Sequence, residues 1–188
     1  MRYLCSQFTE VDGEKLPLFA GVFGIFGHGN VTCLAEALER VHDQVPTWCG
    51  QNEQSIALAA IGYAKARRWR QIMVATSSVG PGATNMVTAA GVAHANRLPL
   101  LLLSGDTYVD RLPDRILQQV EHFGDPSTTV NDSFRAMSRY WDRIADPTDC
   151  GPAFIGLPQD TQELAYDYPE EFFAATMWTI PRPCPSRD

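Results

Sequence analysis

The sequence predicts an α/β fold in which a parallel β-sheet carries helices on both faces. Short runs that are apolar throughout alternate with longer segments of helical periodicity. Strands that are buried on both faces lose the alternation of polar and apolar residues seen in half-exposed strands, so this pattern indicates a covered parallel sheet. The composition agrees, because 45% of the 188 residues are hydrophobic and 20% are charged, which is typical of a folded domain.

The expected elements of the first half are short strands, each followed by a helix. Residues 22–26 form an apolar run that ends at Gly-His-Gly-Asn, and apolar residues at helical spacing follow over residues 34–41. Residues 47–49 are a short strand candidate. A long helix is expected over Glu53–Arg67, where one stripe of the helix surface is apolar. Each change from an apolar run to helical periodicity predicts a strand followed by a helix.

The same alternation continues through the middle of the chain. Residues 72–76 are a strand candidate that ends in small polar residues. The sequence Gly-Pro-Gly-Ala-Thr-Asn, residues 80–85, separates this strand from an alanine-rich helix that reaches about Asn96. Residues 98–103 are a further buried strand, because the run is almost continuously leucine.

The pattern weakens in the last part of the chain. Residues 106–149 are rich in Asp, Arg, Pro and Ser, with one helix expected around Asp132–Tyr140. Residues 153–157 form the last expected strand. We therefore expect one domain over residues 1–165, followed by a proline-rich extended linker over residues 166–188.

Composition excludes several classes of function. The net charge of −7 and the pI near 5.0 argue against nucleic acid or an anionic membrane as a partner. The five cysteines are scattered singly, so neither a zinc site nor a redox pair is indicated, and reduced thiols in the cytoplasm are expected. The chain has no apolar run long enough for a membrane span and no secretory signal at its start.

Three segments lie where predicted strands end and helices begin, which is where ligands bind in open parallel sheets. They are residues 27–30, 51–53 and 77–85. Their glycines let a ligand approach the backbone closely, and helix N-termini favour anionic or polar groups. The chain contains neither the Gly-Lys-Ser/Thr of a phosphate-binding loop nor the Gly-x-Ser-x-Gly of a nucleophile elbow. We therefore expect the site at the carboxyl edge of the sheet.

Glu53 and His28 each allow two interpretations from the residues alone. Glu53 begins a helix in an apolar neighbourhood, so it is either a first-turn glutamate favoured by the helix dipole or a carboxyl tuned for acid–base chemistry. His28 lies between two glycines and is either a hydrogen-bonding loop residue or a catalyst. The other three histidines have no partner pattern and are expected to be structural.

Taken together, these segments resemble the pyrimidine-binding domain of thiamine-diphosphate enzymes. The segment Gln-Asn-Glu-Gln around Glu53 and the glycine segment that ends at Asn85 carry this resemblance. More narrowly, the chain is similar to the 3D-(3,5/4)-trihydroxycyclohexane-1,2-dione hydrolases of inositol catabolism, which open a cyclic 1,2-dione. This similarity covers nearly the whole chain, and the stretches that carry it are Phe19–Asn30, Leu98–Asp106, Val130–Arg135 and Ser138–Tyr140.

The resemblance assigns roles to particular residues. It implies that Glu53 hydrogen-bonds N1′ of the cofactor's aminopyrimidine, in a pocket of low dielectric constant that favours proton transfer. It places His28 and Asn30 in the first active-site loop. Gln118 matches a glutamine that faces the reacting centre, although an exposed polar loop residue is an equally good interpretation. The turn near the pyrimidine ring is expected to consist of Gly80, Pro81 and Gly82, with Asn85 as a further cofactor contact.

The family also has parts that this chain does not match. In the family, Mg²⁺ and the diphosphate of the cofactor are held by another domain, so no metal ligand is expected here. The cofactor site is shared between subunits, which implies a homo-oligomer. The chain begins partway into the family's first helix, and a late helix is missing between Asp146 and Pro147. These departures indicate a fragment or an internally deleted variant.

The expected function follows from this resemblance. The chain is expected to be the thiamine-diphosphate-binding portion of a C–C bond hydrolase that converts the cyclic polyol dione to 5-deoxy-glucuronate, and to be inactive as a fragment alone. Two alternatives stay open at this point. One is an acetolactate-synthase-like thiamine-diphosphate carboligase, and the other is a non-catalytic remnant that pairs with full-length subunits.

Overall fold

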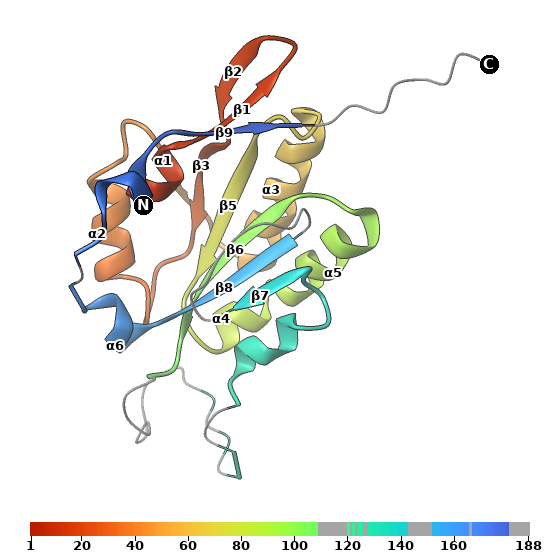
Figure 1. The fold of residues 1–188 in the computed structure, drawn as a ribbon. Helices are drawn as coiled ribbons and strands as arrows, with labels where there is room; N and C mark the ends of the chain where they lie inside the picture. Colours follow the sequence, from red (N-terminus) through yellow and green to blue (C-terminus); the bar gives the residue numbers. More distant parts are fainter. Residues whose placement is uncertain are drawn as a thin grey trace.

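A six-stranded parallel β-sheet forms the centre of the molecule (Figure 1). The structure, a computed structural model, describes residues 1–108, 120, 122, 124–125, 128–142, 152–165 and 167–180. Each neighbouring pair of strands runs parallel, which confirms the α/β class. In spatial order the strands are β4 (Thr47–Cys49), β3 (Phe19–Gly24), β5 (Ile72–Ser77), β6 (Leu100–Asp106), β8 (Pro152–Pro158) and β7 (Tyr140–Asp142).

The two central strands, β5 and β6, are buried along their whole length. Their continuous apolar sequences predict this position, since both faces of a central parallel strand are covered. The strand expected over residues 98–103 begins at Leu100 and continues to Asp106. Its start is shifted past Pro99, because proline has no N–H to donate to the neighbouring strand.

Helices cover both faces of the sheet, as predicted (Figure 1). On one face, α3 (Glu53–Ala66) and α5 (Val87–Asn96) pack through alanines, among them Ala60 and Ala90, which are completely buried. On the other face, α2 (Cys33–Glu39) packs through Leu34 and Leu38, and α1 (Arg2–Cys5) adds Leu4. The small alanine side chains of α3 and α5 allow these helices to lie close to the sheet.

The ends of these helices have identifiable causes. The Asn52 side chain accepts a hydrogen bond from the Ser55 N–H at 2.9 Å, which caps the start of α3. The predicted alanine-rich helix is α5, which ends at Asn96 as expected, and a short additional helix, α4 (Pro81–Thr84), lies within the segment predicted to separate it from β5. A left-handed residue, Arg97 with a φ of 54°, ends α5.

A second, three-stranded sheet was not foreseen. β1 (Gln7–Val11) pairs antiparallel with β2 (Glu14–Pro17) and parallel with β9 (Thr176–Thr179). The turn between β1 and β2 has positive φ at Asp12 and Gly13, as in a two-residue hairpin loop. β9 lies within the segment expected to be an extended linker, and η2 (Glu170–Phe173), a 3₁₀ helix, precedes it.

The helix predicted around residues 132–140 is wrong. The chain forms a shorter 3₁₀ helix, η1 (Val130–Phe134), and then enters β7. A capping box between Thr129 and Asp132 fixes the start of η1. Phe134 stacks on Phe154 of β8 at a centroid distance of 4.0 Å, so tertiary packing overrides the local helical pattern.

After β8 the chain forms α6 (Gln159–Gln162), a single turn. Across the part of the chain that the structure describes, no helix combines the length and the apolar character that a membrane crossing requires.

Candidate functional site

The three segments predicted at the carboxyl edge of the sheet lie together in the structure. Asn85 donates a hydrogen bond from Nδ2 to Glu53 Oε2 at 2.9 Å, across 32 residues of sequence. Val79 donates its backbone N–H to the carbonyl oxygen of His28 at 3.0 Å. The first bond joins the end of α4 to the start of α3, and the second joins the loop after β5 to the loop after β3. Parallel topology explains the arrangement, because it brings the ends of neighbouring strands to one edge.

The Glu53 carboxylate has one oxygen bonded to the protein and another that faces a glycine. Glu53 is the first residue of α3, where the helix dipole favours a negative charge, and it is partly buried. Oε2 accepts the bond from Asn85. A Cβ built on Gly82 would lie 3.2 Å from Oε1. Oε1 can therefore accept a further hydrogen bond from a polar group that enters beside Gly82.

The turn of Gly80, Pro81 and Gly82 keeps this space open. Gly80 has a φ of +68°, a conformation that L side chains rarely adopt. Pro81 is the first residue of α4, where a helix has no partner for the missing N–H. A Cβ on Gly82 would meet Ser78 Oγ at 2.5 Å. The turn thus forms a cradle beside the Glu53 carboxylate that a side chain at position 82 would fill.

Asn30 holds the loop after β3 together from the inside. Its side chain is 1% exposed. Oδ1 accepts a hydrogen bond from the Gly27 N–H at 2.8 Å, and Nδ2 donates to the Ile25 carbonyl at 3.1 Å. The resemblance places Asn30 in the active-site loop, and the structure gives its side chain a scaffolding role there.

His28, in the same loop, has bonding capacity that the protein does not use. Its Nε2 atom is buried and has no hydrogen-bond partner among the described residues. Buried polar atoms are rarely left this way, and such an atom is a reason to look for a bound group. His28 is therefore the side chain of this loop that is best suited to contact a ligand.

Gln162 is a residue that sequence reasoning missed. Its side-chain Nε2 donates hydrogen bonds to the carbonyl oxygens of Gly29 and Leu157, both at 2.8 Å. Gly29 follows His28 directly, and Gln162 is 133 residues further along the chain. No spacing or motif in the sequence connects these two positions, so only the folded structure identifies the contact.

The predicted glutamine Gln118 lies outside the residues that the structure describes, so its position relative to Glu53 is a prediction only. Within the described ranges, His, Cys, Asp and Glu side chains form no group of three or more that could hold a metal ion.

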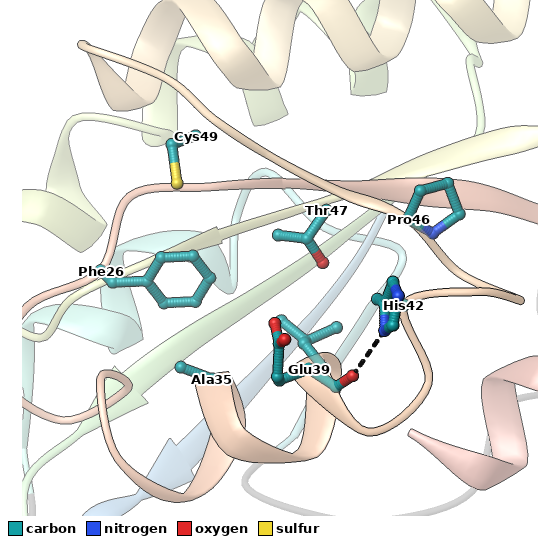
Figure 2. A pocket seen from close by; sticks show the side chains of 8 residues that line it. Phe26, Ala35, Glu39, His42, Pro46, Thr47 and Cys49 are labelled. Carbon is teal, nitrogen blue, oxygen red and sulfur yellow. Dashed lines mark hydrogen bonds between the residues drawn. The ribbon is translucent and has the colours of Figure 1, made fainter.

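A cavity of about 380 Å³ lies elsewhere, between α2 and β4 (Figure 2). Thr47 and Cys49 face it from β4, and the ring of His42, hydrogen-bonded to the Glu39 carbonyl at 2.9 Å, lies at its side. None of Glu53, Gly82 and Asn85 lines it, so it is separate from the carboxyl-edge site. Its lining residues are Phe26, Ala35, Leu38, Glu39, His42, Pro46, Thr47 and Cys49.

Comparison with known protein families shows the family to which this chain belongs. The family described as thiamine pyrophosphate enzyme, N-terminal TPP binding domain, matches residues 19–125. The chain belongs to this family. The matched range covers more than half of the chain and contains the Glu53 and His28 segments and the glycine turn. The resemblance seen in the sequence is thereby confirmed for the domain and for thiamine diphosphate as its cofactor.

Within this family, the chain is similar to several proteins of one name. The chain is 46% identical to a 3D-(3,5/4)-trihydroxycyclohexane-1,2-dione hydrolase of Geobacillus thermodenitrificans over 99% of its length. It is 44% identical, over its whole length, to proteins of the same name from Bacillus cereus and Clostridium tetani. The chain spans 32% of each of these relatives, about one third of their length.

The alignment also bears on the expected missing helix. It runs over 203 residues with the Geobacillus relative, whereas this chain has 188. At least 15 aligned positions therefore have no residue in this chain. In the sequence, nine residues separate the parallel neighbours β7 and β8, whereas a connection between parallel strands usually contains a dozen or more residues and a helix.

Proposed function

We propose that this domain supplies the pyrimidine-binding half of a thiamine-diphosphate-dependent hydrolase that opens a cyclic polyol 1,2-dione. The observation that carries the proposal is the Glu53 carboxylate, which is bonded to Asn85 at one oxygen and open beside Gly82 at the other. The names of the relatives supply the substrate, 3D-(3,5/4)-trihydroxycyclohexane-1,2-dione. The open-chain product is 5-deoxy-glucuronate, as the resemblance implies.

The residues at the carboxyl edge fit the pyrimidine end of the cofactor, which is a flat ring with polar nitrogens. When bound, thiamine diphosphate supplies a carbon that adds to a carbonyl and accepts the electron pair of the C–C bond that breaks. Glu53 Oε1 accepts a hydrogen bond from a ring nitrogen and exchanges a proton with it. Asn85 keeps the carboxylate oriented, and Gly82 leaves room for the ring. His28 Nε2 bonds a polar group of the substrate.

We further propose that a second domain holds Mg²⁺ and the diphosphate, and that the site is shared within a homo-oligomer in the cytoplasm. The length of the relatives supports this arrangement, because two thirds of each lies beyond the part that this domain matches. In that arrangement Gln118 faces the substrate from this domain. Alone, the 188-residue chain has negligible ring-opening activity.

A second candidate function is a non-catalytic remnant that pairs with full-length subunits. The aligned positions that this chain lacks favour it, because they indicate a loss within the domain itself. Co-purification with a full-length relative, together with no effect of Glu53→Gln on that pairing, would support this alternative.

Titration of the ¹⁵N-labelled chain with thiamine diphosphate tests the proposed site. We expect saturable changes in the amide signals of Glu53, Gly82 and Asn85. The Glu53→Gln variant should bind about tenfold more weakly, because it replaces a charged acceptor with a neutral one. The matched control is Glu36→Gln, an exposed glutamate in the first turn of α2, and it should bind like the unsubstituted chain.

Two results would contradict the proposal. One is a set of signal changes that is absent from the carboxyl edge or is unaltered in Glu53→Gln. The other is robust ring opening of the dione by the purified chain alone, measured by loss of the dione, since the reaction would then need no second domain.

A further inference from the structure

We propose that Gln162 is a positioning residue that fixes the His28 loop in its ligand-binding conformation. The proposal rests on the proposed function, because it takes His28 as the loop residue that contacts the substrate. Gln162 belongs to α6, which follows the last strand of the sheet. Its side chain reaches across to the loop after β3, where Nε2 donates to the Gly29 carbonyl at 2.8 Å.

The other carbonyls of this loop are bonded close to the loop. Those of Gly27 and Asn30 accept backbone N–H groups from the residues that follow them, and that of His28 accepts the Val79 N–H at 3.0 Å. The Gly29 carbonyl is bonded by a side chain that is 133 residues further along the chain. Removing that donor leaves the Gly29 carbonyl without its partner, at the position next to His28.

Gly29 is the residue at which such a bond matters most. It has a φ of +90°, and a Cβ there would lie 3.3 Å from Val79 Cβ and 3.5 Å from Gly105 Cα. Glycine at a positive φ is free to rotate its peptide planes, so the loop needs an external bond to select one orientation. Gln162 supplies it.

The amide of glutamine is suited to this role because it bridges two carbonyls with one nitrogen. Its second N–H donates to the Leu157 carbonyl at 2.8 Å, which ties the loop to the end of β8. Glutamate has no hydrogen to donate, and methionine has a similar length but no polar donor. The pair of bonds therefore connects β8 and α6 to the loop that carries His28.

Amide hydrogen exchange in the 188-residue chain tests the proposal without cofactor or turnover. The variant is Gln162→Met, and the matched control is Gln159→Met, a glutamine of the same helix. The quantity is the exchange rate of the Val79 amide, bonded to His28, divided by that of a core amide such as Val74. We expect this ratio to rise about tenfold in Gln162→Met, the effect of losing one hydrogen bond locally, and less than twofold in the control.

General destabilisation raises the exchange rate of the core amide at least as much as that of Val79 and therefore does not raise the ratio, so a ratio that does not rise in Gln162→Met overturns the proposal. A second readout is the His28 ring, whose signals should split or broaden in Gln162→Met and stay single in the control. If Gln162→Met does not fold, the bond is tested in the unsubstituted chain. The measurement is the scalar coupling across the hydrogen bond between Gln162 Nε2 and the Gly29 carbonyl carbon. Detection supports the bond and its absence overturns it. Thiamine diphosphate binding at Glu53 is measured separately, so failure of either proposal is recognised on its own.

Discussion

Alanine at position 82 tests whether the glycine turn needs empty space or a flexible backbone. Gly82 lies in α4 and has no positive φ, so the backbone accepts alanine, and helix propensity favours it by up to about 1 kcal/mol. Its Cβ would, however, meet Ser78 Oγ at 2.5 Å and Glu53 Oε1 at 3.2 Å. Ser78 is buried, and overpacking of this kind costs about 1–3 kcal/mol. We expect a net loss of about 1–2 kcal/mol.

Urea unfolding followed by tryptophan fluorescence measures this loss as a shift of the midpoint at constant slope. The control is Gly62→Ala, because a Cβ on Gly62 meets nothing within 4 Å; it should be neutral or stabilising by about 0.5–1 kcal/mol. In a Ser78→Ala background, Gly82→Ala should lose most of its cost, since the next nearest Ser78 atom is 3.6 Å from the new Cβ.

The double variant, Ser78→Ala with Gly82→Ala, distinguishes the effect of the new Cβ on stability from its effect on cofactor binding. It should fold, and it should still bind thiamine diphosphate weakly, because the Cβ remains 3.2 Å from Glu53 Oε1. An unfolding midpoint for Gly82→Ala equal to that of the unsubstituted chain would refute the steric reasoning. An equal loss in the presence and absence of the Ser78 hydroxyl would refute it as well.

Three further changes test other parts of the structure. Asn85→Ala should lower stability by less than about 1 kcal/mol, because the bond to Glu53 is exposed, while weakening the thiamine-diphosphate titration severalfold; an unaltered titration would contradict its role. Phe154→Ala removes a fully buried ring stacked on Phe134, so thermal unfolding should show a loss of about 3–5 kcal/mol, and a loss below about 1 kcal/mol would contradict that packing. The pKa of His42 is raised above 6.5 by the backbone carbonyl three residues before it, and then by the neighbouring Asp43 carboxylate. Its ring should therefore titrate above pH 6.5 by NMR, and its small stabilisation is present below that pH and disappears as the pH rises through the folded midpoint; a midpoint at or below 6.5 would contradict this.

The central part of the fold was predictable because its sequence pattern has one physical cause. β5 and β6 are buried on both faces, and such strands need continuous apolar runs. β7 and β9 were missed, because each is short and has no buried residue: β7 is partly buried throughout, and β9 is mostly exposed. β9 pairs with β1 from the other end of the chain, and no local pattern encodes a contact of that range.

Part of the candidate site was likewise predictable from the sequence, and part was not. The segments that carry Glu53 and the glycine turn were predictable, because parallel topology alone brings strand ends to one edge. The direction of individual side chains was not. Asn30 turns inward to bond its own loop, and Gln162 joins the site from a distant turn. Such roles depend on distances in the folded chain.

The pairing of β1 with β9 has a mechanical consequence. A force that pulls residues 1 and 180 apart enters β1 at its first residue and leaves β9 at its last. The strands are parallel, with Gln7 opposite Thr176 and Glu10 opposite Thr179, so this pull slides one strand along the other. All the bonds of the pair then bear the load at once, and they must yield together before the larger sheet is stretched.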